Sequence, residues 1–68
     1  MQPEYQLRVI VEKAALDEKG AALAAFLEGR TFAALPPDEQ GRLTKQLDLM
    51  KQYSVILGER IAAFAPQE

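Results

Sequence analysis

Apolar residues in the second half of the chain follow a heptad spacing, in which steps of four and three residues alternate. The positions are Leu43, Leu47, Met50, Ser54, Leu57, Ile61 and Phe64, of which only Ser54 is polar. Residues at this spacing lie along one face of an α-helix and pack against a partner helix. The pattern predicts a long helix, about residues 37–64, that is covered along its length.

The first half of the chain supplies a partner helix, about residues 3–29. Pro3 and Glu4 suit a first helical turn, and Gly29 is expected as the C-terminal stop. Three apolar residues lie seven apart and can meet the heptad face: Val9, Leu16 and Leu23. With a link over residues 30–36, in which Phe32 and Leu35 close the end, we expect an all-α fold. Residues 1–68 then form a single helical domain whose two long antiparallel helices make a hairpin.

Both predicted helices carry more apolar surface than a hairpin buries. The additional residues are Ile10, Val11, Ala14, Ala21, Ala24, Ala25 and Leu27 in the first helix and Leu49, Tyr53, Val55, Ile56 and Ala63 in the second. A chain of 68 residues is also marginal as a lone core, and it has no cysteine for disulfides. We therefore expect the hairpin to assemble into an interlocked helical homo-oligomer.

Composition excludes several functional classes. The absence of histidine and cysteine removes the usual catalytic bases and zinc ligands, so we expect no enzyme, metal site or cofactor. A net charge of −2 with dispersed charges argues against binding of duplex nucleic acid. No apolar run approaches the ~18 residues of a membrane span, and the start does not read as a secretion signal. The sequence predicts a soluble cytosolic protein.

Three polar residues have plain structural interpretations. Ser54 is expected to bond the backbone of its own helix, because no histidine is present to activate it as a nucleophile. Asp17 and Glu18 are adjacent on a helix and face different directions, so we expect solvated surface rather than an acid and base pair. Gly20, inside the first helix, suggests close packing of a backbone or a ligand.

A line of residues seven apart, Tyr5, Glu12, Lys19 and Phe26, places two charges between two aromatic residues. One interpretation is a solvated flank, with the stem of the lysine covering apolar surface. The other is a groove between protomers, in which Tyr5 stacks on a flat ring and Lys19 pairs with a phosphate. Tyr53 and Arg60 pose the same choice on the second helix, where Arg60 can also form a surface ion pair with its neighbour Glu59.

The sequence also resembles a known family, the small helical phage proteins that act as anti-CBASS cyclic-nucleotide sponges. The resemblance lies in "YQLRVIVEKAALDEK", "AFLEG" and "DEQGRLTKQLDLMKQYSVILGERI", and it covers about residues 5–64. It implies a compact homo-oligomer, a hexamer in the family. It also implies binding of cyclic dinucleotides, and in some members of cyclic trinucleotides at separate sites, without cleavage.

The resemblance further implies roles for particular residues. An aromatic near the start of the chain stacks on a base and a lysine of the first helix meets the phosphates, which here are Tyr5 and Lys19. A late arginine serves the trinucleotide site, which here is Arg60. The stripe including Glu12 and Phe26 then forms a binding face, and the protein acts in the cytoplasm of the infected bacterial host. The alternative is a helical adaptor whose second apolar face docks onto another protein.

Overall fold

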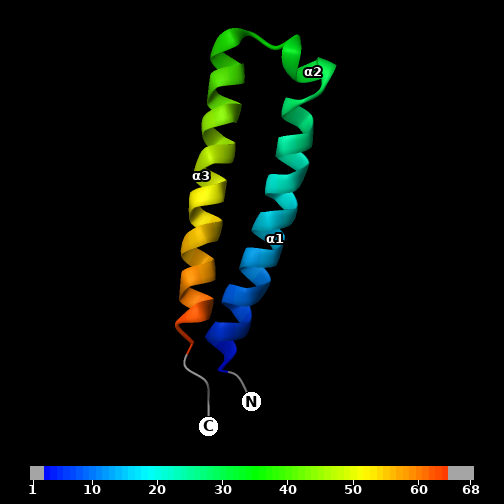
Figure 1. Ribbon diagram of the computed structural model, residues 1–68. Helices are drawn as coiled ribbons and strands as arrows, with labels where there is room; N and C mark the ends of the chain where they lie inside the picture. Colours follow the sequence, from blue (N-terminus) through cyan, green and yellow to red (C-terminus); the bar gives the residue numbers. More distant parts are fainter. Residues whose placement is uncertain (1–2, 65–68) are drawn as a thin grey trace.

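The computed structural model describes residues 3–64, and all of the regular structure in that range is helical. Helix α1 spans Glu4–Leu27, α2 spans Arg30–Ala33 and α3 spans Pro37–Ala62. The long helices α1 and α3 lie side by side and antiparallel, with α2 at the connecting end (Figure 1). The all-α hairpin predicted from the sequence is confirmed.

A single seam joins the two long helices. On α3 it is the predicted heptad, in which Leu57 is completely buried and the other members are half-buried. On α1 the facing residues also follow steps of three and four: Gln6, Val9, Lys13, Leu16, Gly20, Leu23 and Leu27. Val9, Leu16 and Leu23 thus lie where the sequence predicted them. Because only Val9 and Leu57 are buried apolar residues within residues 3–64, the core of one chain is thin.

The connecting end is held by one side chain of α3. The Gln40 amide nitrogen donates to the carbonyl oxygens of Phe32, Ala33 and Leu35, at 3.1, 3.2 and 2.9 Å. Ala33 is the last residue of α2, and its carbonyl has no partner within that helix, so the Gln40 amide supplies a donor for it. Helix α1 ends at Leu27 with Glu28 as its C-cap, so Gly29 directly follows the end of the helix, as predicted; its backbone is extended and it is also the N-cap of α2.

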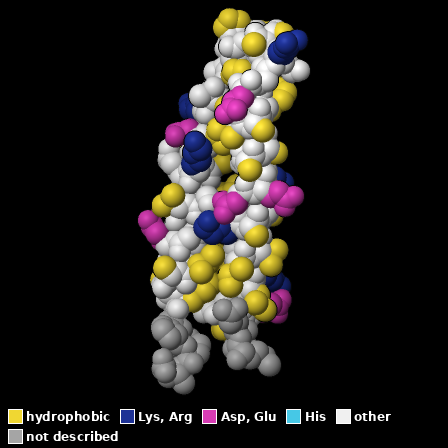
Figure 2. All heavy atoms as spheres, turned by 45° about the vertical axis from the view of Figure 1, so that its right-hand side comes forward, with side chains coloured by type: hydrophobic (Ala, Val, Ile, Leu, Met, Phe, Trp, Pro, Cys, Tyr) yellow, Lys and Arg dark blue, Asp and Glu magenta, His cyan; other side chains and the backbone are white. Residues whose placement is uncertain are grey.

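Large apolar side chains remain exposed along the hairpin. Val11 is 66% exposed, Val55 60%, Leu49 55% and Ile56 53%, and Figure 2 shows apolar side chains reaching the surface along its length. One chain therefore leaves open the surplus apolar faces that the sequence led us to expect. None of the helices in residues 3–64 is long and apolar enough to cross a membrane.

Candidate functional site

The predicted stripe lies outside the seam, on one edge of α1. Tyr5, Glu12, Lys19 and Phe26 are all exposed, and Tyr5 keeps 56% of its surface in solvent. Each precedes a seam residue by one position, so the four residues share one line beside the seam. The structure places all four on a common edge, and both interpretations of the stripe begin from this position.

A hydrogen bond across the seam identifies the matching edge of α3. The Tyr53 hydroxyl donates to the Glu12 carboxylate, linking the two helices beside the seam. Arg60 lies seven residues after Tyr53, so it continues the same line of α3 toward the end of the hairpin where α1 begins. We call these residues together the tyrosine edge: Tyr5, Glu12, Lys19 and Phe26 of α1, with Tyr53 and Arg60 of α3.

Tyr5 stands at the open end of the hairpin. Its ring meets that of Phe64 edge to face, with centroids 5.8 Å apart and planes at 82°. Its hydroxyl accepts a long hydrogen bond of 3.4 Å from the amide of Gln6, which is itself buried. These contacts orient the ring while more than half of the residue remains exposed, so an aromatic surface is available to an external ring.

Phe26 occupies the opposite end of the tyrosine edge. Its ring meets that of Phe32 in α2 edge to face, with centroids 6.3 Å apart. Since a helix rises 1.5 Å per residue, Tyr5 and Phe26 are about 31 Å apart along α1. Within one chain they cannot contact the same small ligand, and Phe26 has a clear structural role in closing the connecting end.

Two cations of the tyrosine edge are available to an external anion. Lys19 and Arg60 are exposed, and neither takes part in an ion pair within residues 3–64. Arg60 therefore does not form the expected pair with Glu59 in this part of the chain. The exposed lysine and arginine are donors suited to phosphate oxygens, as a point charge and a planar fork respectively.

The opposite edge of the hairpin contains a polar network that the sequence interpretation missed. The Ser54 hydroxyl donates to the Asp17 carboxylate of the other helix, so the expected bond to its own helix backbone is wrong. Lys13 donates to the same carboxylate at 2.7 Å. Asp17 is thus a cross-helix acceptor rather than merely solvated surface. These two donors hold the pKa of the Asp17 carboxyl below its ordinary value.

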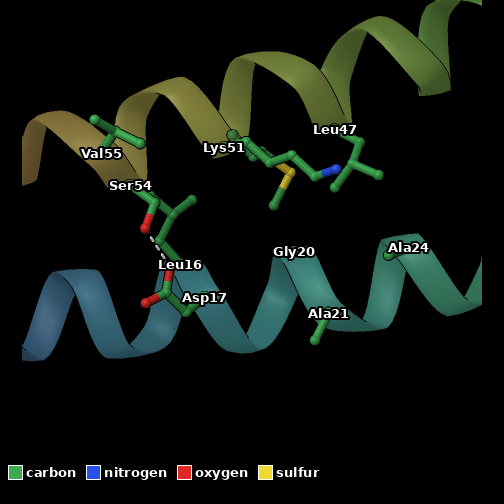
Figure 3. Close-up of a pocket in the computed structure, with 10 residues that line it drawn as sticks. Leu16, Asp17, Gly20, Ala21, Ala24, Leu47, Lys51, Ser54 and Val55 are labelled. Carbon is green, nitrogen blue, oxygen red and sulfur yellow. Dashed lines mark hydrogen bonds between the residues drawn. The ribbon is translucent and has the colours of Figure 1, made fainter. Parts of the chain in front are cut away.

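Beside this network lies an open hollow of about 380 Å³. Figure 3 shows that α1 contributes the small residues Gly20, Ala21 and Ala24, while the Lys51 side chain extends along it from α3. A Cβ added to Gly20 would meet nothing within 4 Å, so this glycine leaves space and does not pack closely as expected within the chain. The hollow is lined by Lys51 but by no aromatic residue, whereas the tyrosine edge combines aromatic rings with cations that have no ion pair within residues 3–64.

A metal site has no support in the described part of the chain, where no three ligating side chains come together. Stacking on a flat ring requires an exposed aromatic ring, and a cation without an internal partner is a strong donor for a phosphate. Tyr5 supplies the first requirement and Lys19 and Arg60 supply the second. The tyrosine edge is therefore the candidate site for a planar, anionic ligand.

Residues 3–63 match the sequence profile of a protein family described as Sequestin. The chain belongs to the Sequestin family. The resemblance to the anti-CBASS cyclic-nucleotide sponges agrees with this membership, because the family's name denotes sequestration, a binding function rather than a catalytic one. For this Sequestin protein, no match exists among curated proteins or solved structures.

Proposed function

We propose that this Sequestin protein is a phage counter-defence protein that sequesters cyclic oligonucleotide second messengers in the cytoplasm of the infected bacterium. The observation that carries the proposal is the tyrosine edge, where an exposed aromatic ring shares one line with a lysine that has no ion pair within residues 3–64. A cyclic dinucleotide presents flat bases and anionic phosphates, which are the groups that these side chains suit.

The geometry of α1 favours a site shared between copies. Tyr5 and Lys19 are separated by 14 residues on one helix, or about 21 Å along its axis. That separation is too long for one chain to hold a base and its adjoining phosphate with both side chains. A second copy placed antiparallel to the first brings the Tyr5 of one beside the Lys19 of the other. A twofold arrangement of this kind matches the symmetry of a cyclic dinucleotide.

The remaining residues of the edge receive separate roles in this proposal. The Glu12 carboxylate would repel a phosphate, so we assign it to holding Tyr53 rather than to contacting the ligand. Phe26 supports the connecting end through Phe32. Arg60 contacts a cyclic trinucleotide at a site distinct from that of Tyr5 and Lys19.

The proposal includes binding without cleavage and assembly into a homo-oligomer, with a hexamer as the expected form. Binding without turnover is supported by the absence of histidine and cysteine and by the position of Ser54, whose hydroxyl donates to Asp17 on the edge away from the ligand. Assembly is supported by the exposed apolar side chains of both helices, because a lone hairpin leaves them in water.

The test is to titrate the purified protein with a panel of cyclic di- and trinucleotides by calorimetry and thermal shift. The linear dinucleotide with the same bases is the matched control ligand. A sponge gains thermal stability with at least one cyclic ligand and releases it chemically unchanged after heating, as read by chromatography. Linear product that accumulates with time would show an enzyme, and indifference to every nucleotide would favour the helical adaptor.

A further inference from the structure

The outer face of α1 carries a line of apolar and acidic residues away from the seam, which we call the acidic stripe. It follows steps of three and four residues and consists of Glu4, Leu7, Val11, Ala14, Glu18, Ala21, Ala25 and Glu28. Every one of these residues is exposed, and none of them is a cation. Glu4 bonds Arg8 beside the stripe, whereas Glu18 and Glu28 have no ion pair within residues 3–64. The stripe therefore has the spacing of a helix-packing face and a negative charge.

The flank of α3 carries a matching line, which we call the basic stripe. It consists of Arg42, Gln46, Leu49, Tyr53, Ile56, Arg60 and Ala63, all exposed and none of them an anion. Lys45 and Glu59 border it with opposite charges, so Arg42 and Arg60 give the stripe its positive character. Arg42 is paired with Glu39 at 2.8 Å, but Lys45 and Arg60 have no ion pair in the described range. Tyr53 and Arg60 belong both to this stripe and to the tyrosine edge.

The two stripes also differ in side-chain size. The apolar residues in the middle of the acidic stripe are small, namely Ala14, Ala21 and Ala25, with Glu18 among them. Those in the middle of the basic stripe are large, namely Leu49, Tyr53 and Ile56. Large residues on one helix can fill the space left by small residues on a facing helix, so the two stripes are complementary in side-chain size. Shallow hollows open over Leu7 and Val11 on one stripe and over Leu49 and Tyr53 on the other.

From these observations we infer that the acidic stripe of one copy packs against the basic stripe of a second copy. The contact is heterologous, which means that each protomer uses two different surfaces. Pairing a stripe with its own copy would instead place like charges together, and such juxtaposition is disfavoured. Apolar burial supplies the affinity, and the charges select which face meets which.

This inference rests on the homo-oligomer of the proposed function and makes that assembly specific. Because the basic stripe includes Tyr53 and Arg60, the arriving α1 of the second copy lies beside the tyrosine edge. The interface therefore brings side chains of a second copy toward Arg60 of the first. It is a separate contact from the twofold one proposed to join Tyr5 of one copy with Lys19 of another, and an oligomer such as a hexamer can contain both kinds.

The experiment uses two charge-reversed variants of the full chain. The first combines Glu18→Lys with Glu28→Lys, and the second combines Lys45→Glu with Arg60→Glu. Each variant alone sets like charges across the interface, so its mass in analytical ultracentrifugation is expected to fall toward that of a single chain. Mixing the two variants restores opposite charges at every contact, so the mixture is expected to recover the mass of the unaltered protein.

The controls are circular dichroism, to establish that each variant remains helical, and Thr44→Lys, which adds a cation to the side of α3 opposite the basic stripe and should leave the mass unchanged. If each stripe instead paired with its own copy, a single variant would still place like charges together, as in the unaltered protein. Each variant alone would then keep the mass of the unaltered protein. Single variants that keep the full mass, or a mixture that does not recover it, overturn the inference while leaving an oligomeric sponge intact. An unaltered protein that is monomeric at micromolar concentration overturns both the interface and the proposed assembly.

Discussion

The hydroxyl of Tyr53 in α3 donates a hydrogen bond to the carboxylate of Glu12 in α1, and this contact joins the two helices beside their seam. The bond brings together residues that lie 41 positions apart in the chain. It decides which edge of α3 lies next to the exposed line of Tyr5 and Lys19, and so which residues surround the candidate site. The Glu12 carboxylate thus has a hydrogen-bond donor within the protein and holds the Tyr53 side chain in place.

We expect this bond to be measurable as a coupling between the two helices. Glu12→Ala and Tyr53→Phe each remove it, and their effects on the free energy of unfolding should be smaller together than the sum of the two. The expected coupling is about 0.5–1.5 kcal/mol, the net contribution of one hydrogen bond. Urea unfolding of the two single variants and the double variant measures it. Additive effects would mean that the bond does not contribute to stability.

Ligand binding should depend on Tyr5 and Lys19 in chemically different ways. Tyr5→Ala removes a stacking surface worth about 1 kcal/mol, whereas Tyr5→Phe keeps the ring and serves as the matched control. Lys19→Ala removes a charge-assisted contact worth about 1.5–3 kcal/mol, and its effect should shrink at high salt. Calorimetry with a cyclic dinucleotide measures both affinities, with the oligomer mass of each variant verified first.

Arg60→Ala separates the two proposed ligand sites. It should leave cyclic dinucleotide binding nearly unchanged and weaken binding of a cyclic trinucleotide, because Arg60 is assigned to that second ligand. The same calorimetric titrations measure the two affinities, and the mass must be unchanged for the comparison to hold. With the mass unchanged, equal losses for both ligands would place Arg60 in one common ligand site.

The network around Asp17 predicts a particular sensitivity to acid. Hydrogen bonds from Lys13 and Ser54 lower the pKa of the Asp17 carboxyl in the folded protein. The contribution of the ionised Asp17 carboxylate to stability is therefore complete above its pKa in the unfolded chain, about 3.9. It is lost as the pH falls through the lower pKa of the folded protein. Asp17→Asn should flatten the loss of stability in that window, measured by urea unfolding between pH 2 and pH 6.

Ser54→Ala should weaken the same acid sensitivity by removing one donor to Asp17. Thr44→Ala is its matched control, since the Thr44 hydroxyl donates to the Gln40 carbonyl of its own helix. An unchanged pH dependence in both Asp17→Asn and Ser54→Ala would show that the network has no role in acid stability.

Two glycines in the long helices should respond differently to alanine. Gly20→Ala adds a methyl group in open space, so the helix propensity of alanine should stabilise the protein by about 0.5–1 kcal/mol. At Gly58 the added Cβ would lie 3.2 Å from the Lys13 Cε, so that side chain must shift away from its position near Asp17. Gly58→Ala should therefore raise the thermal unfolding temperature less than Gly20→Ala does. The reverse order would contradict the described packing.

Much of the fold was predictable because helix periodicity is local information. The heptad from Leu43 to Phe64 and the ladder of Val9, Leu16 and Leu23 indicate which faces meet, and the hairpin follows from joining them by a short link. The exposed line of Tyr5 and Lys19 was predictable for the same reason. The partner of Ser54 was not, because the spacing within one helix does not give the alignment of two helices along each other.

The sequence by itself therefore determined the two helices, the face of each that packs and the exposed line of Tyr5 and Lys19 beside it, since all of these depend on a period of 3.6 residues. Only the tertiary structure decided that Tyr53 meets Glu12, that Ser54 and Lys13 both bond Asp17 and that Gly20 borders a hollow. The physical reason is that the relative rotation and axial position of α1 and α3 are set by the fit of side chains along the whole seam. That fit depends on pairs distant in sequence, and no local pattern records it.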